Sequence, residues 1–402
     1  MRGPVSEVFL AFLKLGLTSF GGPVAHLGYF REEFVARRKW LDEAAYADLV
    51  ALCQFLPGPA SSQTGMGIGL MRAGWPGMVA AFLAFTAPSA VALMLFAYGL
   101  EAWGGGLDAG WLTGLKTVAV AVVAQAVWGM AKTLCPDAPR ASVAVAAAIL
   151  VLVWPGFEGQ IAAILAGAVA GLVLAFGNDA KDGGAAIVVP VGRVVAIAAL
   201  VLFLALLFGL PVVTEAGIGG HGLALFDAFY RAGALVFGGG HVVLPLLESQ
   251  VVEPGWVDRE SFLAGYGAAQ AVPGPLFTFA AYLGMVEQGG AGGAPGGWTS
   301  ALLCLGAIFL PSFLLVPAAL PFWSALRGRK GARHALAGVN AAVVGLLLAA
   351  LYDPVFTGAV HGPADAALAL AAFLLLAVWR WPPWLVVLLS AGAGAGLAAL
   401  TT

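Results

Sequence analysis

The sequence has little charge for its length. Only 10% of its 402 residues are charged, whereas 61% are hydrophobic. A soluble domain carries about 25% charged residues, so this composition excludes a water-soluble enzyme and a disordered chain. The 19 basic and 21 acidic residues nearly cancel, which excludes a nucleic-acid-binding protein. The remaining class is a polytopic membrane protein embedded in a lipid bilayer.

The sequence also lacks the motifs of catalytic and metal sites. Its three cysteines, Cys53, Cys135 and Cys304, lie far apart and form no CxxC pair. HExxH, GxSxG and P-loop patterns do not occur, and no group of Cys, His, Asp and Glu has the spacing of metal ligands. We therefore expect no catalytic residue, no metal and no cofactor.

Apolar stretches recur along the whole chain, and each approaches or exceeds the length of a membrane span. The most polar connector is 177–192. We therefore predict an N-terminal domain over 1–176, a linker with a connecting helix over 177–213, and a C-terminal domain over 214–402. The stretches lie near residues 5–29, 44–70, 76–100, 112–131, 141–154, 159–176, 193–213, 222–247, 261–285, 298–322, 334–352, 364–379 and 383–400.

The two predicted domains are repeats of one another. The pattern in Phe9–Gly22 returns in Phe226–Gly239 at a shift of 217, and Gln54–Pro59 returns as Gln270–Pro275 at a shift of 216. An odd number of apolar stretches separates equivalent positions, so the halves are expected to have inverted topology, which is the plan of many secondary transporters. The predicted fold class is an all-α polytopic membrane protein of two homologous, inverted halves with broken or re-entrant helices.

The first two apolar stretches of each half are interrupted near their middle by glycine or proline. Each arm has about 14 residues, too few to cross a bilayer. If these stretches are re-entrant hairpins, Arg31, Arg37, Arg38 and Lys39 join the other loop cations on the inside and Arg259 alone lies outside. The alternative is tilted, broken spans, which would place the first four outside.

Two basic residues at equivalent positions, Lys14 and Arg231, fall inside apolar stretches. An ionisable residue at membrane depth is by default a functional candidate, and two cations suit a doubly charged anion. We therefore expect Lys14→Ala to abolish transport while leaving the protein in the membrane. The alternative is snorkelling or pairing with an acid such as Glu7, Asp48 or Asp227.

A third basic residue, Lys116, also falls in an apolar stretch and aligns with Asn340 in the second half. It lies near the end of its stretch. We therefore expect its ammonium to snorkel to an interface.

The glycine and proline interruptions are the main candidates for a binding site. Broken helices at membrane depth present unpaired backbone N–H groups and a partial positive charge, which replace the hydration of an anion. The alternative is that these residues only kink the helices. The candidate backbone positions are Gly21, Gly22, Pro23, Pro57, Gly58, Pro59, Gly238, Gly239, Pro273, Gly274 and Pro275.

Polar side chains near the interruptions extend this candidate site. Thr18, Ser19, Gln54 and Gln270 are able to hydrogen-bond an oxyanion, although helix–helix hydrogen bonds are an equal alternative. Candidates for carrying a coupling proton are His26, His241 and Asp48, and a structural role is the alternative for each.

The motifs resemble those of the chromate ion transporter family in its long, two-domain form. The resemblance rests on Phe12–Gly28, on Glu33–Leu41 and on Gln54–Pro59 in the first half, and on Phe237–Gly240 and Gln270–Pro275 in the second. It covers nearly the whole chain. It implies efflux of chromate across a bacterial inner membrane, coupled to the proton-motive force, and two halves in opposite orientation.

The second half departs from this pattern where Gly240 replaces Pro23 and where the Arg37-Arg38-Lys39 cluster is missing. We therefore expect the first half to determine specificity. Sulfate or another oxyanion remains an alternative substrate, since chromate and sulfate are both tetrahedral dianions. An anion channel on the same fold, a membrane enzyme such as a chromate reductase, and a scaffold protein are the alternative functions. The oligomeric state, a homo-oligomer included, is left open.

Overall fold

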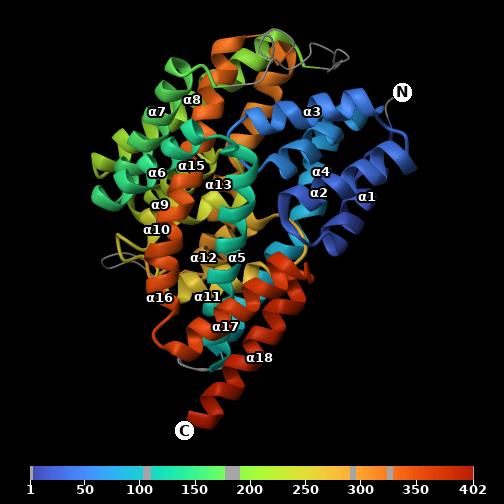
Figure 1. The fold of residues 1–402 in the computed structure, drawn as a ribbon. Helices are drawn as coiled ribbons and strands as arrows, with labels where there is room; N and C mark the ends of the chain where they lie inside the picture. The colour runs from blue at the N-terminus through green and yellow to red at the C-terminus, as the bar shows by residue number, and fades with distance from the viewer. Residues whose placement is uncertain (1–2, 103–109, 177–190, 290–295, 324–328, 402) are drawn as a thin grey trace.

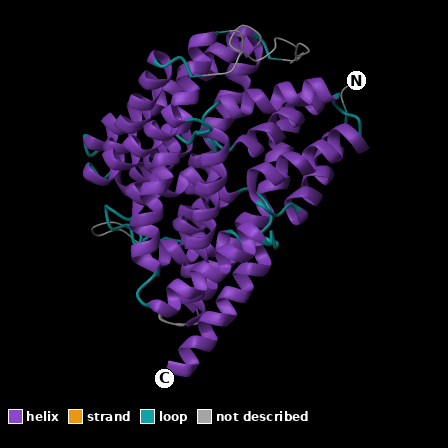
Figure 2. Ribbon diagram, in the orientation of Figure 1, coloured by secondary structure: helices purple, strands orange, loops and turns teal. Residues whose placement is uncertain are grey.

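The computed structural model describes residues 3–102, 110–176, 191–289, 296–323 and 329–401, and within these ranges every regular element is a helix (Figures 1 and 2). In the described part of the chain, five helices are long and apolar enough to cross a membrane: Ala60–Leu100, Gly110–Leu134, Arg193–Glu215, Trp298–Phe322 and Lys330–Ala359. The predicted class, an all-α polytopic membrane protein, is confirmed.

The elements follow the two repeats in the same order. The first half contains α1 (Val5–Thr18), α2 (Gly22–Phe30), η1 (Arg31–Arg37), α3 (Glu43–Phe55), α4 (Ala60–Ala102), α5 (Gly110–Leu134), α6 (Ala138–Val153) and α7 (Phe157–Val173). Of the predicted linker, 177–190 lie outside the described residues. The chain continues with α8 (Arg193–Glu215), α9 (Gly220–Ala234), η2 (Gly240–Val242), α10 (Val243–Val251), α11 (Arg259–Ala269), η3 (Leu276–Thr278), α12 (Phe279–Val286), α13 (Trp298–Ala319), η4 (Leu320–Phe322), α15 (Lys330–Ala350), η5 (Leu351–Phe356), α16 (Thr357–Ala359), α17 (Pro363–Phe373), η6 (Leu374–Val378) and α18 (Pro383–Thr401).

The first half begins with two broken helices. The 14 residues of α1 span about 21 Å, less than the roughly 30 Å hydrocarbon core of a bilayer. The long helix α4 reverses at Ala73 and Gly74, whose backbone angles are not helical. No β-carbon fits between Gly69 and the carbonyl of Gly77, so the two parts of α4 pack directly against each other. Only the part after this reversal has the length of a span.

The second half is broken at the positions equivalent to the break between α1 and α2 and to the break between α3 and α4. Helix α9 ends at Ala234 and the chain resumes as η2 at Gly240, while α11 ends at Ala269 and η3 begins at Leu276. The predicted broken helices are therefore present in both halves. That they are re-entrant, entering and leaving on the same side of a bilayer, stays a prediction.

The halves exchange their last two helices. Helices α6 and α7 of the first half pack against α15 of the second, while α17 and α18 pack against α5 of the first. Both contacts are close: no β-carbon fits between Gly338 and the Gly167 carbonyl, or between Gly114 and the Ser390 carbonyl. Figure 1 shows α5 and α15 in the middle of the molecule and the two chain ends at opposite extremes.

The broken helices meet at two crossings, which contain equivalent residues. Gly274 N–H donates to the Ser19 carbonyl at 3.0 Å, and Gly58 N–H donates to the Val236 carbonyl at 2.7 Å. We call residues 19–23 with 270–276 the open crossing, and residues 54–60 with 236–240 the filled crossing. Reciprocal bonds of this kind are expected of two copies related by a twofold axis. The inverted orientation of the halves itself stays a prediction.

Candidate functional site

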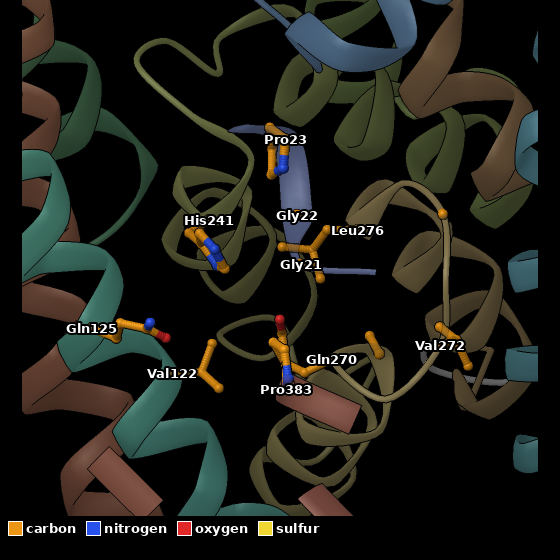
Figure 3. Close-up of a pocket in the computed structure, with 12 residues that line it drawn as sticks. Gly21, Gly22, Pro23, Val122, Gln125, His241, Gln270, Val272, Leu276 and Pro383 are labelled. Atoms are coloured by element: carbon orange, nitrogen blue, oxygen red, sulfur yellow. The ribbon is translucent and has the colours of Figure 1, made fainter. Parts of the chain in front are cut away.

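A cavity of about 100 Å³ lies at the open crossing. Its wall contains Gly21, Gly22 and Pro23 from the first half and His241 with five of the residues between 269 and 276 from the second, and α5 and the start of α18 complete it (Figure 3). A cavity needs only about 15 Å³ on this measure to hold one water, so a small oxyanion has room. The lining residues are Gly21, Gly22, Pro23, Val122, Gln125, His241, Ala269, Gln270, Val272, Gly274, Leu276 and Pro383.

The local sequence explains why helix ends gather at this cavity. Gly21 and Gly22 have positive φ angles of 99° and 76°, which glycine adopts without strain, and they turn the chain between α1 and α2. Pro23 then occupies the first turn of α2, where its missing N–H costs nothing. Helix α18 likewise begins at Pro383. The N-termini of α2 and α18 therefore both border the cavity, and each carries a partial positive charge.

Three polar side chains line the cavity: Gln125, His241 and Gln270 (Figure 3). Gln125 Nε2 donates to the Leu376 carbonyl at 3.1 Å, which fixes its amide. Gln270 Nε2 is buried and has no hydrogen-bond partner among the described residues. Turning this amide by 180° exchanges its oxygen and nitrogen without other movement. Gln270 is therefore able to turn an unused donor toward a bound anion.

His241 contacts both the cavity and the protein core. Its Nδ1 lies 2.8 Å from the Tyr266 hydroxyl. It is the one predicted proton-coupling candidate that lines the cavity.

His26, the other histidine candidate, is part of the framework of the crossing. Its Nε2 lies 3.2 Å from the Ser19 carbonyl and its Nδ1 3.4 Å from the Ser61 hydroxyl. Because a carbonyl only accepts, Nε2 carries the proton and Nδ1 accepts from Ser61. Both nitrogens are thus used, and His26 connects the break after α1 to the start of α4.

Lys14 does not line the cavity. Its side chain is 57% exposed, and its Nζ lies 3.8 Å from Glu33 Oε2. Glu33 also accepts hydrogen bonds from Arg37 and Arg38. Burial alone would raise the pKa of Glu33, but these hydrogen bonds hold it below its ordinary value. Lys14 therefore belongs to a charge network that joins α1 to η1 and Arg38.

Arg231 does not line the cavity either, and it has a carboxylate partner of its own. Its Nη2 lies 2.7 Å and its Nε 3.0 Å from the two oxygens of Asp227, whose side chain is only 2% exposed. The guanidinium also packs over the ring of Phe157 at 4.7 Å. For Arg231 the structure shows the expected alternative, pairing with Asp227. The two equivalent cations are not brought together at the cavity.

The expectation that Lys116 snorkels is wrong. Its side chain is 8% exposed, and its Nζ lies 3.2 Å from Glu260 Oε2. It thus forms an ion pair between α5 of the first half and α11 of the second.

Of the predicted site residues, the structure gathers Gly21, Gly22, Pro23, Gln270, Gly274 and His241 around the cavity. The lining residues that sequence reasoning missed are Val122, Gln125, Ala269, Val272, Leu276 and Pro383. The others do not line the cavity: Lys14, Thr18, Ser19, His26, Asp48, Gln54, Pro57, Gly58, Pro59, Arg231, Gly238, Gly239, Pro273 and Pro275.

Thr18 and Gln54 were predicted from motif spacing to lie at the site, but both side chains are exposed outside the cavity. Thr18 bonds the Lys14 carbonyl of its own helix at 2.8 Å and is exposed. Gln54, the repeat equivalent of Gln270, is also exposed. The expectation that the first half determines specificity is not reflected in the cavity, since two of its three polar side chains come from the second half.

Comparison with known proteins places the chain among membrane transporters. A family model described as "Chromate transporter" matches residues 6–221 and 223–395. A chromate transport protein of Pseudomonas aeruginosa is 29% identical over 357 residues, which cover 86% of this chain and 80% of that protein. A probable chromate transport protein of Synechococcus elongatus is 28% identical, covering 78% of this chain and 75% of that protein. An uncharacterized transporter of Methanocaldococcus jannaschii is 26% identical over 85% of this chain and 82% of its own length. No solved structure matches the chain significantly.

Proposed function

The chain belongs to the chromate transporter family, and from this premise we propose that it exports chromate by secondary active transport through the cavity at the open crossing. Its relatives are named as transporters, so it is a transporter and not an enzyme such as a chromate reductase. The alternative substrates in the same site are sulfate and other tetrahedral oxyanions.

The observation that carries this proposal is the composition of the cavity wall. Two helix N-termini border it, and Gln270 contributes a buried amide with an unused donor. None of the lining residues is Asp, Glu, Lys or Arg. Neutral donors and helix dipoles stabilise a dianion without binding it so tightly that release becomes slow. This is how broken-helix transporters bind anionic groups.

Transport then requires the cavity to open alternately to each side. We propose that the halves have inverted topology and that the broken helices rock against α5, α15 and the exchanged helices that pack on them. The reciprocal bonds at the two crossings support this arrangement. The protein would work in a bacterial inner membrane with the proton-motive force as its energy source, and His241 is the coupling candidate in contact with the substrate site.

The test is chromate flux into proteoliposomes, with equal amounts of inserted protein for each variant. Gln270→Leu removes a donor from the cavity and is expected to lower uptake about tenfold, since a hydrogen bond to a charged group contributes about 1.5–3 kcal/mol. Gln54→Leu, at the equivalent but exposed position, is the matched control and should transport like wild type. Equal flux for both variants would remove the cavity from the transport path.

The same assay distinguishes the alternatives. Sulfate in excess reduces chromate flux if both dianions share the site. Transport that follows an imposed pH gradient supports proton coupling, whereas flux that depends only on the electrochemical gradient of the anion indicates a channel.

A further inference from the structure

The contact between His241 and Tyr266 determines what the histidine presents to the cavity. His241 lies in η2 and lines the cavity, while Tyr266 lies on α11. The Tyr266 side chain is fully buried, and its ring packs edge-on against Phe279 at a centroid distance of 5.8 Å. In the described part of the chain, the partner of its hydroxyl is His241 Nδ1 at 2.8 Å.

The direction of this hydrogen bond follows from what surrounds the hydroxyl. If Nδ1 donated the proton, the hydroxyl hydrogen of Tyr266 would be left in an apolar environment without an acceptor, which is unfavourable. If Tyr266 donates, its only hydrogen is satisfied. Nδ1 of His241 is then the acceptor, and the neutral imidazole carries its proton on Nε2.

We infer that Tyr266 is a positioning residue for substrate binding: its hydroxyl holds His241 in the tautomer that presents an Nε2–H donor to the oxyanion. This inference rests on the proposed function, because it requires the cavity to be the substrate site. The opposite tautomer would present a lone pair, which repels an anion. Tyr266 itself does not line the cavity and acts only through His241.

The pair belongs to the second half alone. His241 aligns with Val24 of the first repeat, and Tyr266 aligns with Val50. The filled crossing therefore has no equivalent of this hydrogen-bonded pair. The pair thus adds a specific donor to one of two otherwise similar crossings.

The first experiment replaces the hydroxyl and preserves the ring. Tyr266→Phe is expected to raise the KM for chromate about tenfold and to change kcat less than twofold. Without the Tyr266 hydroxyl, His241 is no longer held in the tautomer that presents its Nε2–H donor, and this donor acts in substrate binding. The matched control is Tyr282→Phe, because Tyr282 is as deeply buried and its hydroxyl donates to the Ser261 carbonyl at 3.0 Å, away from the cavity. The control should keep the wild-type KM.

A double-mutant cycle separates positioning from a merely structural role. His241→Gln places an amide donor near the position of Nε2 that does not depend on Tyr266. In this background Tyr266→Phe should leave the KM unchanged, whereas a structural role of Tyr266 would produce the same tenfold loss in both backgrounds and overturn the inference. Chromate affinity is also measured at equilibrium in detergent. This measurement detects binding by a variant that no longer transports chromate.

Two outcomes distinguish the positioning role of Tyr266 from the proposal that the cavity is the substrate site. If His241→Ala weakens chromate binding but Tyr266→Phe does not, the positioning role is wrong and the cavity remains the site. If His241→Ala and Gln270→Leu both bind and transport chromate like wild type, the cavity is not the substrate site and both proposals fail.

Discussion

The two crossings have the same backbone design but different contents. At the filled crossing, Gln63 occupies the space beneath Gly58, where its Nε2 donates to the Pro57 carbonyl at 2.6 Å and lies 3.3 Å from Ser312 Oγ. Its repeat equivalent, Phe279, stacks against Tyr282, and the open crossing contains the cavity. The two copies of the repeat thus carry different side chains at this position, Gln63 at the filled crossing and Phe279 at the open one.

The largest expected effect comes from the equivalent cations Arg231 and Lys14. Arg231→Ala leaves the carboxylate of Asp227 buried without its partner, which should cost about 3 kcal/mol and sharply lower the amount of folded protein in the membrane. Lys14→Ala removes only a long, exposed contact, and we now expect near wild-type abundance and transport. Abundance and flux measured together check both. Abolished transport in Lys14→Ala at normal abundance would restore Lys14 to the transport path.

The equivalent glycines test the crossings directly. Gly58 and Gly274 have φ angles of 118° and 103°, and a β-carbon on Gly274 would lie 2.8 Å from Ser89 Oγ. Each change to alanine should destabilise the protein by about 1–3 kcal/mol through backbone strain, seen as a lower Tm in detergent. Only Gly274→Ala, at the open crossing, should also weaken chromate affinity. Equal losses of affinity in both variants would mean that the crossings act as one unit.

The smallest effect concerns two glutamates, one in η1 of the first half and one in α10 of the second. Glu33 has three cations around it. Among the described residues the one cation near Glu248, which lies in the second part of α10 and outside the long spans, is Arg259 at 3.7 Å. Burial, reinforced by Glu253, raises the pKa of Glu248 from 4.5 to about 7. Stability should therefore be lost as the pH rises from about 4.5 to about 7, where the buried carboxyl ionises.

The corresponding measurement is Tm against pH. Between pH 5 and 7.5 this ionisation should remove about 2 kcal/mol, and Glu248→Gln should abolish that part of the decline. Glu33→Gln serves as the control, because the lowered pKa of Glu33 keeps it charged throughout this range. A decline that is unchanged in Glu248→Gln would assign the pH dependence to other groups.

The sequence was informative where a backbone feature has a local cause. Gly21, Gly22 and Gly274 have positive φ angles and Pro23 lacks an N–H, so both the breaks and part of the cavity wall followed from the glycine and proline pattern of the repeats. Periodicity and hydropathy were likewise sufficient for the all-α membrane class.

The rest of the site depends on packing between distant segments. Gln125 lies in the middle of α5 without any motif, and Pro383 reaches the cavity only because α18 of the other half packs on α5. The prediction that Lys14 binds the anion rested on its depth in an apolar stretch. The face of α1 on which Lys14 lies determines its actual partner, Glu33. Gln54 and Gln270 have the same motif, and only tertiary packing exposes one and buries the amide of the other.

The exchange of terminal helices has a consequence for biogenesis. Helices α6 and α7 leave the ribosome well before α15, the helix against which Ala147 of α6 and Gly167 of α7 pack. During synthesis α6 and α7 therefore lie in the lipid without their packing partner. The first half completes its tertiary structure only after most of the second half has been inserted.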